Sequence, residues 1–380
     1  MHINELLTLM VNKGASDLHL TVPSPPVFRI EGVLIPQEDL PPMTAKDVEV
    51  ALEEAATQEQ RAMFDREWEL DFAYAVPGLA RFRVNALRQR GVISLAFRFV
   101  PFYVPSIDDW GLPQIFKELI LKPRGIILVT GPSGSGKSTT LAAMLRYLNE
   151  NATKNVITVE DPIEFLFRNK GCLIRQRDLG DDTKSFATAV IHALRHDADV
   201  IVIGEMRDLD TISTAITAAE TGHLVLATLH TVSAPQAIDR IIDVFPHGQQ
   251  QQIRVQLSQV IEAVISQALI PRIEGGRIAA FEIMLASHTI RKYIRDEKIF
   301  EIPVTMEVSR PEGMQTLDQA LTDLVKRKII TLEDALMNSR DPVKLQQLHQ
   351  FQGEANMSQN IVGSLAANQE GLGWTRKEYS

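Results

Sequence analysis

The sequence is poor in cysteine, in aromatic residues and in basic charge. Its only cysteine is Cys172, so no disulfide can form within the chain and no cysteine-based zinc site is available, which fits a reducing compartment. Aromatic residues make up 6% of the chain, and 48 acidic against 39 basic residues give a net charge of −9. This balance disfavours non-specific attraction to nucleic acid or anionic lipid. We therefore expect no direct nucleic-acid binding.

The N-terminal segment, MHINELLTLMVNKGASDLHL, also lacks a long apolar run. Its apolar stretch ends at Asn12 and Lys13, which makes it too short and too polar for a signal peptide or a membrane span. We expect a cytoplasmic protein whose association with a membrane, where it occurs, is peripheral.

What the chain does have is enough length and apolar content for two compact domains, with 380 residues of which 45% are hydrophobic. Residues 1–100 are expected to form a small α/β domain. Its elements are predicted as helices over 3–13 and near 44–64, and strands over 17–22, 28–34, 68–76, 80–87 and 92–100. Three prolines in the segment 101–113, PFYVPSIDDWGLP, break both periodicities and indicate a linker.

The second domain is expected over residues 114–348. Apolar runs at 126–129, 156–159, 200–203 and 224–229 alternate with helix-like segments, which predicts βα units around a mostly parallel sheet. Helices are expected to dominate from about residue 246 to 348. The final stretch, 349–380, is rich in Gly, Asn, Gln and Ser and is expected to be mostly disordered.

A phosphate-binding motif lies between a strand-like run and a helix-like run. GPSGSGKS follows the pattern G-x-x-x-x-G-K-[ST], in which glycines turn backbone N–H groups toward phosphates. Lys137 is expected to reach the β- and γ-phosphates and Ser138 to offer its hydroxyl to Mg²⁺. The context argues against a chance match and predicts a site for ATP and Mg²⁺. The expected nucleotide-binding residues are Gly131, Ser133, Gly134, Ser135, Gly136, Lys137, Ser138 and Thr139.

Two acidic clusters follow strand-like runs after this loop. VIVIGEMRD puts Glu205 at the carboxyl end of a strand, where it is expected to reach the metal or its water. ITVEDPIEF supplies Glu160, Asp161 and Glu164, one of which is expected to polarise the attacking water. The alternative interpretation, solvated acids at strand ends, is weakened because both clusters occur in the order expected after a phosphate loop.

Two histidines flank a third apolar strand in AETGHLVLATLHT. His223 and His230 are too far apart along a strand to be paired metal ligands. His230, at the carboxyl end, is better placed to sense the γ-phosphate, and His223 is as much a structural as a functional candidate.

Arginines recur on one face of the strands expected in the first domain. Arg81 and Arg83 share a face of ARFRV, and Arg98 follows on a later strand. A solvated strand face is the simpler interpretation of these three residues.

Taken in order, the phosphate loop, ITVEDPIEF, LRHDADVIVIGEMRD and AETGHLVLATLHT closely resemble the hexameric ATPases of the secretion and type IV pilus superfamily. The chain is most similar to the pilus retraction branch (twitching motility, PilT-type), over nearly all residues up to about 345. The resemblance implies a small PAS-like N-terminal domain, a RecA-like ATPase domain with a helical C-terminal portion, and a ring of six.

The resemblance also implies roles for individual residues. It assigns general-base work to Glu164 and magnesium and water handling to Glu205, although the two glutamates can be exchanged in these roles. It assigns γ-phosphate sensing to His230 with support from His223. Nucleotide contacts across a domain or subunit boundary are implied for Arg83 and Arg98, with Arg195 as a further candidate.

A C-terminal helix motif of the retraction branch is matched by TIRKYIRD, which keeps Ile290, Arg291, Ile294 and Arg295. In the branch this motif is associated with motor output, whereas an ordinary amphipathic surface helix is the alternative. Three residues of TIRKYIRD depart from the usual motif.

The leading hypothesis is a hexameric ATP-hydrolysing motor that retracts type IV pili. Its partner would be a pilus platform protein of the inner membrane, and its location the inner face of the cytoplasmic membrane. The alternatives are an accessory PilU-type ATPase working with a paralogous retraction ATPase, a pilus-extension or secretion ATPase, a RecA-like DNA translocase and a non-hydrolysing scaffold.

Overall fold

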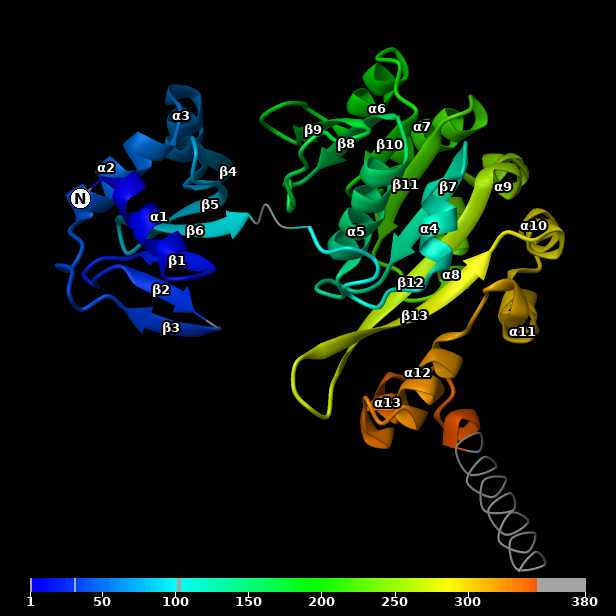
Figure 1. Ribbon diagram of the computed structural model, residues 1–380. Helices are drawn as coiled ribbons and strands as arrows, with labels where there is room; N and C mark the ends of the chain where they lie inside the picture. Colours follow the sequence, from blue (N-terminus) through cyan, green and yellow to red (C-terminus); the bar gives the residue numbers. More distant parts are fainter. Residues whose placement is uncertain (1, 31, 101–103, 347–380) are drawn as a thin grey trace, which may run out of the picture. The chain divides into compact units, whose positions relative to one another are not determined.

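The computed structural model describes residues 2–30, 32–100 and 104–346 (Figure 1). The chain forms two compact units. One combines the described residues of 1–129, 137–229 and 241–262, and the other combines residues 130–136, 230–240 and 263–346. Within the described part of the chain, no helix is both long and apolar enough to cross a membrane. The boundaries of the two domains predicted from the sequence stay a prediction.

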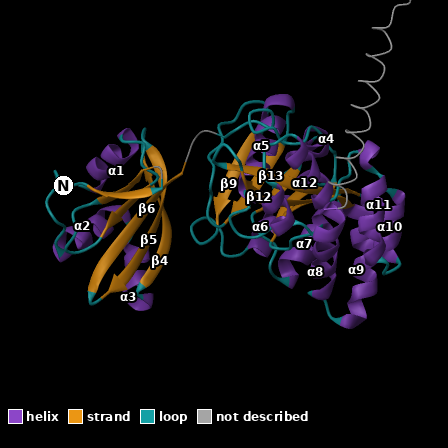
Figure 2. Ribbon diagram, turned by 90° about the horizontal axis from the view of Figure 1, so that it is seen from below, coloured by secondary structure: helices purple, strands orange, loops and turns teal. Residues whose placement is uncertain are grey.

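The first 100 residues build an antiparallel sheet of six strands in the order β3-β2-β1-β6-β5-β4. Its strands are β1 (Asp17–Leu20), β2 (Val27–Ile30), β3 (Val33–Pro36), β4 (Glu69–Val76), β5 (Ala80–Gln89) and β6 (Val92–Val100), and its helices are α1 (Ile3–Asn12), α2 (Ala45–Ala55) and α3 (Gln58–Glu67). Alternating residues of β5 and β6, among them Phe82 and Phe97, are fully buried in a core shared with the helices. The residues that alternate with these on β5, among them Arg81 and Arg83, are not buried. Helices α1 and α2 lie along one side of this sheet (Figure 2).

Two predictions for this region were wrong in detail. The strand expected over 28–34 is the hairpin β2–β3, because the chain turns at Gly32, where φ is +84°. The helix expected near 44–64 is two helices, since Thr57 starts the second one. The Thr57 hydroxyl accepts the Gln60 N–H at 3.3 Å while the Gln60 side chain accepts the Thr57 N–H at 2.9 Å.

A second sheet has seven strands in the order β13-β12-β7-β11-β10-β8-β9. They are β7 (Gly125–Thr130), β8 (Asn155–Glu160), β9 (Leu173–Asp178), β10 (Val200–Ile203), β11 (Leu224–Leu229), β12 (Ile261–Pro271) and β13 (Arg277–Leu285). The pairs β8–β9, β8–β10 and β10–β11 are parallel. Helices α4 (Ile115–Ile120), α5 (Lys137–Asn151), α6 (Phe186–Leu194), α7 (Leu209–Glu220), α8 (Ala234–Asp243) and α9 (His247–Val260) lie between the strands in sequence. The expected alternation of strands and helices is confirmed.

The expectation that helices dominate after residue 246 was wrong for β12 and β13, which form a long antiparallel hairpin. Most residues of β12 are buried, so its apolar pattern lacks the alternation that separates a strand from a buried helix. The helical portion begins later, with α10 (His288–Arg295), α11 (Ile302–Val308), α12 (Leu317–Lys326) and α13 (Leu332–Asn338), accompanied by short turns at Ile299–Glu301 and Arg310–Glu312. The tail predicted over 349–380 and part of the predicted linker, 101–103, lie outside the described residues.

Candidate nucleotide site

The phosphate loop connects the end of β7 to the start of α5, and two of its positions accept only glycine. A Cβ atom on Gly131, where φ is +147°, would lie 2.4 Å from the backbone oxygen of Gln267 on β12. A Cβ atom on Gly136, where φ is +89°, would lie 2.8 Å from the amide nitrogen of the same Gln267 side chain. Just before the loop, the Thr130 and Ser266 hydroxyls are hydrogen-bonded at 2.8 Å. Strand β12 therefore supports the loop from one side.

The chemistry of this loop fits a phosphate group. The Ser135 hydroxyl is buried and has no hydrogen-bond partner among the described residues. Ser133 and Gly134 are exposed, and Gly134 adopts a φ of +74° that turns the backbone. A buried hydroxyl without a hydrogen-bond partner, in a glycine-rich turn at the N-terminus of α5, is an arrangement suited to an anion.

Lys137, at the first position of α5, is buried, with 9% of its surface exposed. Loss of water lowers the pKa of its ammonium group, while the carboxylates of Glu205 and, less strongly, Glu164 raise it. Both predicted glutamates therefore influence this lysine. Ser138 and Thr139 follow in the same helical turn and are partly exposed. The Ser138 hydroxyl and the Glu205 carboxylate are oxygen donors of the kind that Mg²⁺ prefers.

Glu205 is held by its own neighbours at the end of β10. The Arg207 guanidinium contacts both carboxylate oxygens at 2.6 Å, and the Glu205 side chain is only 17% exposed. The hydrogen bond to Glu205 raises the pKa of Arg207. The Met206 N–H donates to the Thr228 oxygen of β11 at 3.1 Å. These contacts fix the backbone and the charge of Glu205 at the carboxyl edge of the strands.

The structure separates the acids of ITVEDPIEF. The Glu160 carboxylate accepts the Thr158 hydroxyl at 2.6 Å and the Gln176 amide at 3.1 Å, and burial raises the pKa of Glu160. Asp161 and Glu164 are exposed in the turn that follows. Glu160 therefore stabilises the fold through these hydrogen bonds. Glu164 is exposed to solvent, and a general base must be accessible to the water that it deprotonates. The general-base role of Glu164 stays a prediction.

The two histidines lie at opposite ends of β11. The six residues between them correspond to about 20 Å along an extended strand. His223 Nδ1 lies 2.9 Å from the Ala218 oxygen, and the His223 oxygen accepts the Gly125 N–H at the start of β7. The phosphate loop follows the other end of β7. His230 directly follows the carboxyl end of β11, and the supporting role of His223 stays a prediction.

The arginines of the first sheet lie side by side. Arg83 and Arg98 are direct partners in the β5–β6 ladder. Arg98 Nε donates to Asp17 Oδ1 at 2.7 Å, and Asp17 is 5% exposed. Burial raises the pKa of Asp17, but hydrogen bonds from Ser16 and Arg98 outweigh it and hold that pKa below 3.8. Arg83 is looser, with its Nε 3.8 Å from Asp71.

The remaining predicted residues lie on helices. Arg195 is exposed at the end of α6. In TIRKYIRD, helix α10 buries Ile290 and Ile294 completely. Arg291 Nε donates to the Ala286 oxygen at 3.1 Å, and Arg295 Nε lies 3.6 Å from Asp296. Helix α10 is thus amphipathic, and its role in motor output stays a prediction.

Sequence reasoning missed the residues that support these groups from distant segments. Ser266 and Gln267 lie about 130 residues after the loop that they contact, and the segment containing them was expected to be helical. Asp17 was recognised as a strand residue but not as the partner of Arg98. No motif in the sequence marks any of these three.

A glycine-rich loop between a strand and a helix, with carboxylates at the ends of neighbouring parallel strands, defines a P-loop nucleotide-binding protein. The chain belongs to the family described as "Type II/IV secretion system protein", whose model matches residues 1–277. It is 46% identical to the Type IV pilus retractation ATPase PilT of Pseudomonas aeruginosa over 90% of this chain and 99% of the relative.

Two further comparisons agree. The chain is 40% identical to the Type IV pilus ATPase PilU of Pseudomonas aeruginosa, with 89% of each protein covered. A crystal structure of the pilus retraction motor PilT with bound ADP matches with a TM-score of 0.86 at 43% identity, covering 91% of this chain and 99% of that one. The α/β fold and the membership of a nucleotide-binding ATPase family are thereby confirmed.

Proposed function

We propose that this chain is a Mg²⁺-dependent ATPase that works as a ring of six and powers the retraction of type IV pili. The observation that carries the proposal is the buried Lys137 at the end of a glycine-rich loop, in a chain 46% identical to a retraction ATPase along nearly the whole of that relative. Residues 1–100 would be its PAS-like domain, 101–113 a linker and 114–348 its ATPase domain.

The chemistry would be hydrolysis of the γ-phosphate of ATP. Backbone N–H groups of residues 131–136 and the Lys137 ammonium would hold the phosphates, and His230 would contact the γ-phosphate. Bound Mg²⁺, held by the oxygens of Ser138 and Glu205, would neutralise charge on the β- and γ-phosphates. Glu164 would accept a proton from the attacking water. The oxygen of that water would bond to the γ-phosphorus while the bond from this phosphorus to the bridging oxygen of ADP breaks, which leaves ADP and inorganic phosphate.

Force would come from closure of nucleotide-loaded subunits around the ring. Arg83 and Arg98 would contact nucleotide across a domain or subunit boundary and respond to its charge. Arg195 would act as a further contact. Helix α10 would pass the motion on to an inner-membrane platform protein, with the ring on the cytoplasmic side of that membrane.

An accessory role beside a paralogous retraction ATPase is the second candidate, because TIRKYIRD departs from the usual motif and the chain is also 40% identical to PilU. The two are distinguished by twitching motility. A main motor restores motility to a host strain that lacks every retraction ATPase, and an accessory one restores it only when a paralogue is present.

The biochemical test uses the purified chain, its Glu205→Gln variant and the control Glu220→Gln, an exposed acid at the end of α7. We expect Mg²⁺-dependent hydrolysis by particles with the mass of six subunits, measured by phosphate release and light scattering. Glu205→Gln should abolish hydrolysis while ADP binding persists, and Glu220→Gln should not differ from wild type. A wild-type chain that binds nucleotide as a monomer without turnover would sink the proposal.

A further inference from the structure

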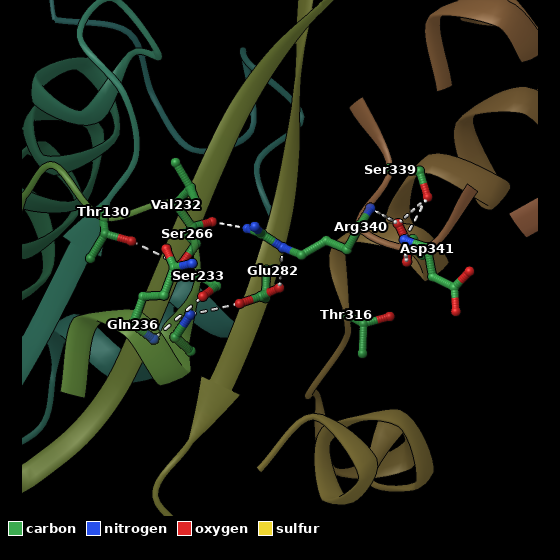
Figure 3. A network of polar contacts seen from close by, with 12 residues as sticks. Thr130, Val232, Ser233, Gln236, Ser266, Glu282, Thr316, Ser339, Arg340 and Asp341 are labelled. Atoms are coloured by element: carbon green, nitrogen blue, oxygen red, sulfur yellow. Dashed lines mark hydrogen bonds and ion pairs between the residues drawn. The ribbon is translucent and has the colours of Figure 1, made fainter. Parts of the chain in front are cut away.

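An ion pair with a buried carboxylate lies in the unit that contains His230, where Glu282 pairs with Arg340, whose side chain is 32% exposed. Glu282, on β13, is 5% exposed, so its charge is costly unless other groups compensate for it. One carboxylate oxygen accepts the Ala234 N–H at 2.7 Å, and the other lies 3.4 Å from Arg340 Nε (Figure 3). Burial raises the pKa of Glu282, and the Arg340 charge and these hydrogen bonds oppose that rise.

The partners of Glu282 hold the segment Val232–Ala234, which begins two residues after His230. Ala234 is the first residue of α8, so Glu282 satisfies a helix N-terminus from another strand. The Arg340 guanidinium also donates to the Val232 backbone oxygen. Thr231 lies between His230 and Val232, and its hydroxyl is buried and has no hydrogen-bond partner in the described ranges. The backbone next to His230 is therefore set by one strand residue and one C-terminal residue.

Arg340 is itself fixed by the C-terminal helices. Asp318, on α12, accepts the Arg340 N–H and the Ser339 hydroxyl, each at 2.8 Å. Its other oxygen accepts the Asp341 N–H at 3.1 Å. Because three groups just after α13 converge on one carboxylate, the Arg340 side chain extends from a rigid base toward Glu282 (Figure 3).

The contacts around Glu282 also extend to the residue that precedes the phosphate loop. Ser266 is the direct cross-strand partner of Glu282 in the β12–β13 ladder, so both side chains point to one face of the hairpin. The Ser266 hydroxyl bonds Thr130, the last residue before the loop. Figure 3 shows Thr130, Ser266, Glu282 and Arg340 following one another across this unit.

We propose that Glu282 and Arg340 are positioning residues that set the backbone beside His230 and couple it to helices α12 and α13. A displacement of His230 by a γ-phosphate is passed through Val232 and Ala234 to the ion pair, and from Arg340 to the Asp318 anchor. The inference rests on the proposed function, since it takes His230 as the group that distinguishes ATP from ADP. Neither residue touches nucleotide.

The test compares Glu282→Gln, Arg340→Gln and the double variant with wild type and with the control Lys344→Gln. Lys344 forms an ion pair with Glu307 at 2.6 Å in the same C-terminal segment, but that pair is exposed. Titrations measure affinity for ADP and for a non-hydrolysable ATP analogue, and phosphate release gives kcat. We expect each single variant to bind ADP as wild type does, to bind the analogue about tenfold more weakly and to lose at least about tenfold in kcat.

The double variant should lose no more than the more impaired single variant, because the two residues act as one pair. Arg340→Lys keeps the positive charge and should therefore recover part of the lost analogue affinity and kcat. It replaces Arg340→Gln in the test if that variant does not fold. If the variants lose affinity for ADP and for the analogue equally, the inference alone is overturned. The same holds if the folded variants keep full activity while the wild type is active. A wild type without hydrolysis overturns the proposed function and this inference with it.

Discussion

The two β-sheets of this protein put polar side chains in different places. In the six-stranded sheet, Arg83 and Arg98 stand in the middle of their strands, on a face opposite the core. In the seven-stranded sheet, every residue of β7 and of β11 is buried, and the predicted site residues Glu164, Glu205 and His230 come after the ends of strands. A sheet covered on one face offers a surface for charge along its strands, whereas a sheet covered on both faces confines chemistry to its edges.

The sharpest test of the strand-end half of this comparison uses two glutamates of ITVEDPIEF, Glu160 at the end of β8 and Glu164 in the turn after it. Glu164→Gln should lower kcat for ATP about 100- to 10,000-fold, the range for removal of a general base, without changing ADP affinity. Glu160→Gln should keep kcat within about twofold, because burial already favours the neutral carboxyl and an amide preserves its shape. Phosphate release under saturating ATP measures both.

The reverse outcome, with Glu160→Gln inactive and Glu164→Gln active, would assign the role of general base to Glu160 instead of to the exposed Glu164. Thermal unfolding of both variants serves as the control for folding. A loss of activity that follows the melting temperature, rather than the position of the substitution, would contradict the assignment.

Glycine substitutions probe the same edge with a smaller expected effect. Gly131→Ala brings a Cβ atom within 2.4 Å of the Gln267 oxygen, so the loop must shift and ATP affinity should fall at least about tenfold. Gly134→Ala meets no atom within 4 Å and carries only the cost of its positive φ, about 1 to 2 kcal/mol. Titration with ATP and calorimetry separate the two. Equal effects would show that backbone strain, not contact with β12, governs the loop.

How far the sequence predicts this molecule follows from the same contrast. The alternating strands β4, β5 and β6 and the phosphate loop were predicted close to where they lie, because period and motif are local signals. Strand β12 was not, since a buried strand has no alternation to read.

In the site, the residue types and their order predicted roles for Lys137, Glu205 and Glu164, and these roles stay predictions. The support from Gln267, Asp17 and Glu282 depends on contacts between distant segments, which one sequence does not encode in any motif.

For the exposed face of the six-stranded sheet, the comparison predicts that a substitution changes activity with little change in stability. Arg83→Ala should change the free energy of unfolding by less than about 0.5 kcal/mol, because its nearest carboxylate, on Asp71, is 3.8 Å away and both side chains are exposed. If Arg83 contacts nucleotide as proposed, kcat should still fall about tenfold. Phosphate release and urea unfolding on one preparation test this. An unstable but active variant would show that Arg83 stabilises the sheet and does not contact nucleotide, which would contradict the comparison.

The smallest effect concerns Asp17, the buried partner of Arg98 on that face. Because the pKa of folded Asp17 lies below its ordinary value of 3.8, the ionised carboxyl stabilises the fold above pH 3.8, and this contribution is lost as pH falls through the folded pKa. Asp17→Asn should therefore lower stability by about 1 kcal/mol at pH 7 and progressively less below pH 3.8. Hydrogen exchange of the Leu18 and Phe97 amides at pH 7, 5 and 3.5 reports on this sheet. Asp71→Asn, at an exposed carboxyl, is the control and should change nothing, while a pH-independent difference for Asp17→Asn would mean that its packing, not its charge, holds Arg98 in place.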